Sequence, residues 1–72
     1  MIVKEWHSPT RYYRLEASKD LFGFWVIRRI WRGRFSKKGS SLTISTENEK
    51  DVQAWINTVE KQRIKKGYKL IS

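Results

Sequence analysis

The spacing of apolar side chains predicts a β-strand near the start of the chain. Residues 11–18 place Tyr13, Leu15 and Ala17 on one side and polar groups on the other, which is the two-residue period of a half-buried strand. Residues 1–10, which contain the only Pro, would form either an edge strand or an ordered arm before it.

Residues 19–23 predict a turn into a second strand. Gly23 is suited to a positive φ, and we expect the preceding Leu21 and Phe22 to be buried in the core. The second strand is expected over residues 24–32, where apolar and basic side chains occur on both faces. Such a pattern indicates either a β-bulge near the middle of the strand or a sheet that is partly covered on both sides.

A third strand is indicated by Leu42 and Ile44, which alternate with Ser and Thr. Residues 34–41 are rich in Ser, Lys and Gly, which is typical of a turn. We therefore expect the second and third strands to form an antiparallel hairpin.

The next segment predicts a helix that starts near Thr46. Thr46 and Glu49 have the spacing of a capping box, in which the Thr hydroxyl accepts a hydrogen bond from the Glu49 amide. Basic side chains fill the last turns, and Gly67 follows as a C-terminal stop. The stripe expected to be buried consists of Val52, Trp55, Ile56 and Val59.

Together these elements predict one domain over residues 1–72, of the α+β class: a small antiparallel β-sheet with one C-terminal helix packed across it. Four Trp, three Tyr and three Phe give this short chain a large area to bury. The sequence has no Cys, so neither disulfides nor thiolate metal sites are expected. Met1 opens a charged segment and not an apolar run, which predicts a cytoplasmic protein without signal peptide or spanning helix.

The formal net charge of +9 is large for this length and predicts a polyanionic partner. The charge is concentrated in residues 24–39, FWVIRRIWRGRFSKKG, and no acid occurs between Asp20 and Glu47. Cations neutralise phosphates, and aromatic rings can stack on a sugar or a base. A solvated basic strand with one core Trp is the alternative interpretation of this stretch.

Nothing in the sequence predicts an enzyme, a metal or a cofactor. The single His, His7, has no second His, Cys or carboxylate pair beside it. The glycines do not form a phosphate-binding loop, and capping explains the carboxylates at the helix start. No membrane partner is expected either, because the apolar stripe of the helix is narrow and the sheet needs it as cover.

Several short motifs resemble, in their order and spacing, the WGR domain family. They are Tyr13-Arg14-Leu15, the turn Asp20-Leu21-Phe22-Gly23 followed by Trp25, then Arg29 and Trp31, and the ending Lys65-Lys66-Gly67-Tyr68. The resemblance covers residues 12–70 and implies an antiparallel sheet with one helix across it. It also implies nucleic-acid binding, as in DNA-dependent poly(ADP-ribose) polymerases, where the namesake motif helps to grip a DNA break; similar modules occur in bacterial proteins.

The namesake Trp-Gly-Arg motif is changed in this chain. It is represented by Trp31-Arg32-Gly33-Arg34. Aligned without a gap, Trp31 keeps its place, Arg32 replaces the Gly and Gly33 replaces the Arg. Arg34 could supply the motif guanidinium only if the strand bulges by one residue.

The resulting hypothesis is a non-enzymatic nucleic-acid-binding module that prefers DNA to RNA and contacts the backbone with little sequence preference. Phosphate contacts would come from the basic hairpin and the helix end, while Trp31 would stack on a sugar or base. The alternative is a protein-interaction module that docks on an acidic partner. The predicted site residues are Arg29, Trp31, Arg32, Arg34, Lys37, Lys38, Lys65 and Lys66, with Lys69 as a further basic flank.

Overall fold

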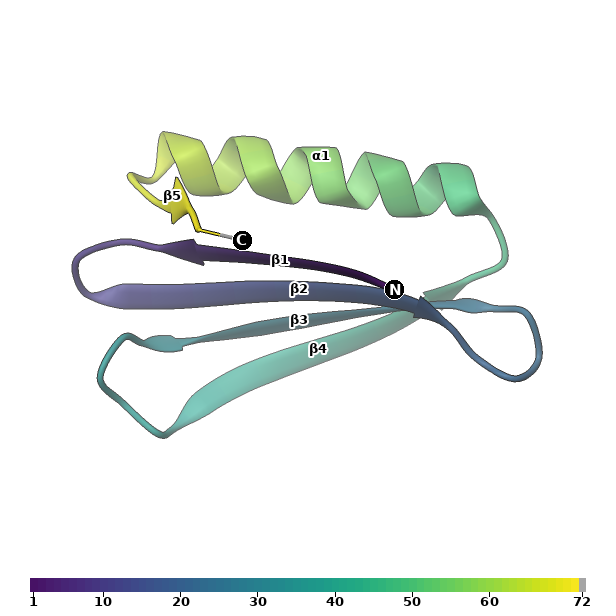
Figure 1. Ribbon diagram of the computed structural model, residues 1–72, viewed down its shortest axis with the longest axis horizontal. Coiled ribbons are helices and arrows are strands. Elements are labelled where there is room, and N and C mark those ends of the chain that lie inside the picture. Colours follow the sequence, from purple (N-terminus) through teal and green to yellow (C-terminus); the bar gives the residue numbers. More distant parts are fainter. Residues whose placement is uncertain (72) are drawn as a thin grey trace.

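Five antiparallel strands form one sheet, and a single helix lies over one of its faces (Figure 1). The computed structural model describes residues 1–71, and the order across the sheet is β4-β3-β2-β1-β5. The predicted α+β class is therefore confirmed, although the helix is not the last element, since β5 follows it. The elements are β1 (Ile2–His7), β2 (Arg11–Lys19), β3 (Trp25–Gly33), β4 (Gly39–Thr46), α1 (Glu49–Lys65) and β5 (Lys69–Leu70).

The end of strand β1 lies inside the sheet, whereas its first residues form one margin of the sheet. The strand pairs with β2 along its whole length and with β5 through Trp6–Leu70 and His7–Lys69. The prediction of an edge strand is therefore correct for residues 2–4 but wrong for the end of β1, where the chain returns after α1 and adds β5 outside it. Trp6 is fully buried as a result.

Strand β3 is regular, and the β-bulge considered from the sequence does not occur. Nine consecutive residues of β3 pair with β2, and the register passes through Leu15–Arg29 and Ala17–Ile27 without an insertion. Every second residue of β3 therefore faces α1, including Ile27 and Arg29. The opposite face also holds half-buried residues such as Ile30, so both faces of β3 are covered in part.

The core lies between the sheet and α1. Its buried members come from β1, β2, β3 and the helix, with Trp25, Trp55 and Tyr68 packed against it in part. Burial of an aromatic or large aliphatic side chain contributes roughly 1.5–3 kcal/mol, so this cluster supplies most of the stability of so small a chain. The buried residues are Trp6, Tyr13, Leu15, Ala17, Ile27, Val52, Ile56 and Val59.

The turn between β2 and β3 differs from the prediction in what it buries. Gly23 has the expected positive φ of 84°. Leu21 and Phe22, however, are 99% and 85% exposed. The Asp20 carboxylate accepts hydrogen bonds from the amides of Phe22 and Phe24, at 2.9 and 3.0 Å, and so closes a tight turn that holds both apolar side chains outside the core.

The cap of α1 lies two residues later than the sequence predicts. Asn48 is the N-cap, and its side-chain oxygen accepts from the Lys50 amide at 2.9 Å. The Thr46 hydroxyl instead donates to the Asp51 carboxylate at 2.9 Å, so the predicted capping box is wrong. Gly67, with a φ of 87°, ends the helix as expected.

Candidate functional site

Tyr13 is the centre of an aromatic cluster on the face of the sheet that α1 covers. The register sets Trp6 of β1 and Trp31 of β3 on either side of Tyr13 in β2. Trp31 stacks beside the Tyr13 ring, with centroids 6.3 Å apart and an angle of 14° between the planes. Trp6 meets the same ring edge-on at 6.0 Å, and Tyr68 does so at 6.5 Å from the segment after the helix. The cluster thus joins three parts of the chain that are distant in sequence.

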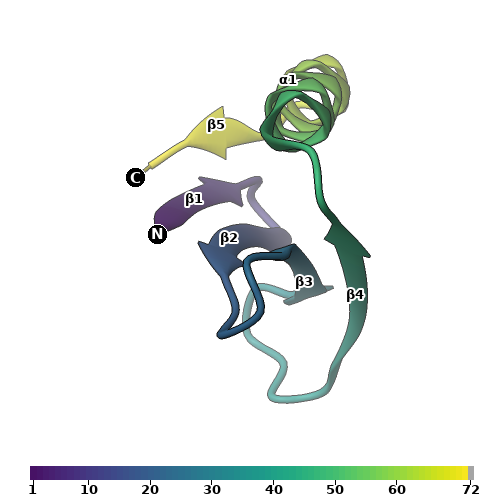
Figure 2. The same ribbon diagram turned by 90° about the vertical axis from the view of Figure 1, so that its right-hand side faces the viewer.

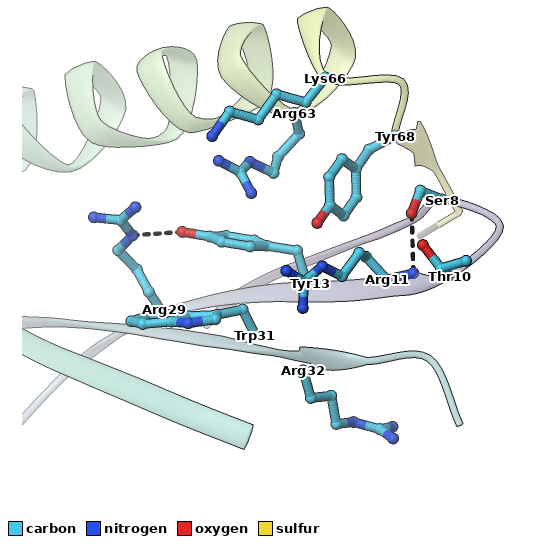
Figure 3. Close-up of a pocket in the computed structure, with 10 residues that line it drawn as sticks. All are labelled: Ser8, Thr10, Arg11, Tyr13, Arg29, Trp31, Arg32, Arg63, Lys66 and Tyr68. Atoms are coloured by element: carbon cyan, nitrogen blue, oxygen red, sulfur yellow. Dashed lines mark hydrogen bonds between the residues drawn. The ribbon is translucent and has the colours of Figure 1, made fainter. Parts of the chain in front are cut away.

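Arg63 of α1 is inserted into this cluster (Figure 3). Its side chain is only 9% exposed, and its Cζ lies 4.3 Å from the Tyr13 ring centre and 5.1 Å from that of Tyr68. Within residues 1–71 no carboxylate forms an ion pair with it, and its Nε has no hydrogen-bond partner. The two ring faces offset part of the cost of burying this charge, and an anion could supply the rest.

Arg29 of β3 reaches the other side of Tyr13. Its Nε donates a hydrogen bond to the Tyr13 hydroxyl at 2.5 Å, and its guanidinium lies 5.5 Å from the centre of the Trp55 ring. No acid of the described chain pairs with Arg29 either. Two guanidinium groups therefore converge on one buried Tyr without a neutralising carboxylate, which makes this cluster a positive site.

A cleft of about 510 Å³ opens beside this cluster. Trp31, which is 36% exposed, presents part of its ring there, and Lys66 extends over the cleft from the end of the helix (Figure 3). The cleft thus combines cations with an accessible aromatic surface. Its lining consists of Ser8, Thr10, Arg11, Tyr13, Arg29, Trp31, Arg32, Arg63, Lys66 and Tyr68.

The structure separates the guanidinium of Arg32 from the other groups of the cleft. Arg32 follows Trp31 in a regular strand, so its side chain leaves the opposite face of the sheet (Figure 3). There it lies 4.5 Å from the centre of the Tyr12 ring and donates to the Ser36 carbonyl at 2.9 Å. Of the predicted residues, the structure thus brings together Arg29, Trp31 and Lys66. The Arg32 side chain lies on the opposite face of the sheet.

Arg34, Lys37 and Lys38 belong to the β3–β4 loop. Because β3 ends at Gly33 without a bulge, Arg34 does not occupy the strand position of the WGR arginine. The Arg34 amide donates to the Thr10 carbonyl at 2.8 Å, which ties this loop to the β1–β2 loop. Lys37 and Lys38 are exposed, as is Lys65 at the end of α1.

Charge is strongly segregated along the molecule. The β1–β2 loop, the β3–β4 loop and the end of α1 meet at one end, on the left of Figure 1. Four of the seven acids, Asp20, Glu47, Glu49 and Asp51, lie in segments at the opposite end. Segments 7–11, 32–39 and 63–71 contain no acid and nine cations, which we call the basic end: Arg11, Arg32, Arg34, Lys37, Lys38, Arg63, Lys65, Lys66 and Lys69.

The face of the sheet away from α1 is electrostatically different. Arg14 pairs there with Glu5 at 3.0 Å and with Glu16 at 2.9 Å. Tyr12 and these two carboxylates raise the pKa of Arg14 above its ordinary value, so its guanidinium stays charged and neutralised. On this face Arg14 is neutralised by two carboxylates, whereas Arg29 and Arg63 on the face toward α1 form no ion pair within residues 1–71.

Arg63 and Tyr13 were not predicted as site residues. Of the basic residues in the last helical turns, Lys65 and Lys66 were predicted as site residues, whereas Arg63 was explained by the helix dipole alone. The signal was nevertheless present, because Arg63 continues the buried stripe of Val52, Ile56 and Val59 at a spacing of four. A cation in a buried stripe indicates a site more strongly than a cation on a solvated face.

Comparison with known proteins identifies no relative. No protein-family model matches the chain, and neither a curated protein nor a solved structure matches it. Membership of the WGR family therefore stays a prediction from the motifs. In the part of the chain that the structure describes, no helix is long and apolar enough to cross a membrane, and no three potential ligand side chains are grouped as a metal site would need.

Proposed function

We propose that this protein is a non-enzymatic nucleic-acid-binding module that prefers DNA and holds the sugar–phosphate backbone at its basic end. The observation that carries the proposal is the gathering of nine cations and no acid from three separate segments at that end. Nucleic acid is the polyanion whose regular charge spacing suits such a surface.

The cleft supplies the more specific contacts of this proposal. Arg29 and Arg63 have no acidic partner in residues 1–71, so a phosphate oxygen would be their first anionic ligand. The exposed part of Trp31 lies beside them and would stack on a sugar or a base. The loop residues Lys37 and Lys38 would contact further phosphates along the nucleic-acid strand.

The proposal also includes a WGR-like arrangement of the helix and the sheet. A WGR-like domain has its helix across the sheet, and the shared core of α1 and the strands supports that arrangement. Arg63 and Lys65 lie in the last turn of α1, and Lys50 lies at its other end, so no continuous basic face of the helix is available to enter a groove. Backbone contacts with little sequence preference follow from this geometry.

The test is a titration of fluorescent duplex and single-stranded DNA at several salt concentrations. About four phosphate contacts on a duplex give a slope near −3.6 for log K against log salt, at about −0.9 per contact. The variant Lys65→Gln/Lys66→Gln should weaken binding roughly tenfold or more. Its control, Lys19→Gln/Lys50→Gln, lowers the net charge equally but at the acidic end, and should change affinity far less.

Two outcomes would overturn the proposal. One is the absence of DNA binding at low ionic strength, and the other is an equal effect of the two charge variants. A competition experiment distinguishes this proposal from the alternative of an acidic protein partner. Polyglutamate of matched charge should displace bound DNA only weakly, whereas a module for acidic proteins would bind polyglutamate in preference to DNA.

A further inference from the structure

Strand β4 presents a long and unprotected edge of the sheet. It pairs only with β3 and forms one margin of the sheet, with no described segment beyond it (Figure 2). Six of its eight residues are exposed. The backbone groups on its outer side are therefore free to accept another strand.

Charged residues, prolines and β-bulges, which usually prevent an edge strand from pairing with another chain, are missing from β4. The sequence of β4, GSSLTIST, has no charged residue and no Pro. Its register with β3 runs from Trp25–Thr46 to Arg32–Gly39 without a bulge. The opposite margin, by contrast, consists of the two-residue strand β5 and the start of β1, which contains the charged residue Lys4. Each of the other strands of the described chain contains at least one charged residue, so β4 differs from all of them.

We propose that β4 pairs with β4 of a second copy in an antiparallel manner, so that the two sheets become continuous. A two-fold axis perpendicular to the sheet leaves α1 of both copies on the same side and sets a β4 residue opposite its own counterpart. Centred on Thr43, this pairing sets Leu42 of each copy opposite Ile44 of its partner on the face toward α1. It would cover apolar surface of Leu42, which is exposed in the single chain.

Charge complementarity favours a second copy as the occupant. Because the strands run in opposite directions, the β3–β4 loop of one copy meets the start of α1 of the other. The loop carries Lys37 and Lys38, and the helix start carries Glu47 and Glu49; none of the four forms an ion pair within residues 1–71. The two-fold symmetry repeats this contact between loop lysines and helix-start glutamates, so that it occurs twice in the dimer. The attraction in these two contacts offsets the repulsion between two chains of net charge +9.

Sedimentation equilibrium without nucleic acid tests this pairing independently of the proposed function. The wild-type protein should show a monomer–dimer equilibrium. Thr43→Glu should weaken it at least tenfold, because the symmetric register sets the two carboxylates side by side. Within one copy the new Glu faces Arg28 across the sheet, so the fold itself should tolerate the change. Gln53→Glu alters an exposed site of α1 by the same charge and should leave dimerisation unchanged.

A second test of the dimer uses charge-reversal variants. Lys37→Glu and Glu49→Lys should each weaken the dimer, and the double variant should restore it toward the wild-type constant, while circular dichroism verifies folding. The proposal is overturned if the protein stays monomeric at millimolar concentration, or if Thr43→Glu and Gln53→Glu behave alike. Capture of a different strand instead of a second copy would appear as a monomer in this assay, and would likewise count against it.

Discussion

The guanidinium of Arg63 lies 4.3 Å from the centre of the Tyr13 ring, and only 9% of its side chain is exposed. A buried arginine without an acidic partner is costly, since desolvation is repaid only in part by the aromatic rings. Replacement of such a group by an apolar residue of similar size often leaves stability unchanged or improves it. Its presence here is consistent with a role in holding an anion.

Arg63→Met separates binding from stability. Met fills a similar volume and contacts Tyr13 and Tyr68 favourably, so the free energy of unfolding should change by less than about 1.5 kcal/mol. Affinity for DNA should fall roughly tenfold, as expected for loss of a charged hydrogen bond. Urea denaturation and DNA titration measure the two effects. A large loss of stability with normal DNA affinity would assign Arg63 to the core instead.

Tyr13→Phe removes the acceptor of the Arg29 hydrogen bond and leaves the ring in place. The loss should cost about 1 kcal/mol, which corresponds to a melting temperature lower by roughly 4–8 °C in a chain of this size. Arg29 should then be less ordered, and DNA should bind more weakly although Tyr13 itself makes no proposed contact. Differential scanning calorimetry and titration provide the readouts; Tyr12→Phe, which removes a hydroxyl from the opposite face, is the control for DNA affinity and should leave it unchanged.

Trp31→Leu tests stacking at the cleft. Leu retains an apolar cover for Tyr13 but has no ring, so affinity for single-stranded DNA should fall by about 1–3 kcal/mol. Trp25, which is half-buried, lies at the start of β3 outside the cleft, and Trp25→Leu should leave affinity near the wild-type value. Equal losses in the two variants, at similar melting temperatures, would refute stacking by Trp31.

Gly39→Ala should damage the sheet next to the site. A Cβ at this position would lie 2.6 Å from the Trp31 carbonyl oxygen and 2.8 Å from the Arg32 Cβ, so the backbone must move. Overpacking of this kind costs about 1–3 kcal/mol. At Gly33 the nearest atom would be the Ser36 Cβ at 3.4 Å, and Gly33→Ala should therefore be tolerated. Thermal unfolding of the two variants checks this difference.

Local periodicity was sufficient to predict the strands of the hairpins, the helix and the fold class. The alternation at Tyr13 and Leu15 and the helical stripe from Val52 to Val59 reflect burial on one side of each element, which the sequence records directly. Gly23 and Gly67 were also predicted correctly, because a positive φ is a local requirement. These features need no knowledge of distant segments.

The remaining features depend on contacts between distant segments. Trp6 is flanked by charged and polar residues, and only the late addition of β5 places its end of β1 inside the sheet. The side of β3 that receives α1 cannot be read from its mixed faces, so Arg29 and Arg32 could not be separated by pattern alone. Arg63 became a site residue only when the sheet placed Tyr13 beneath it.

The segregation of charge has a consequence for how the molecule meets its ligand. Its longest dimension is 38 Å, whereas electrostatic forces in physiological salt decay over about 8 Å. A polyanion that approaches the lysine- and arginine-rich tip therefore does not sense the carboxylates at the far pole. In the proposed function, a single copy would be turned with its basic end toward the polyanion only over the last ~8 Å of the approach.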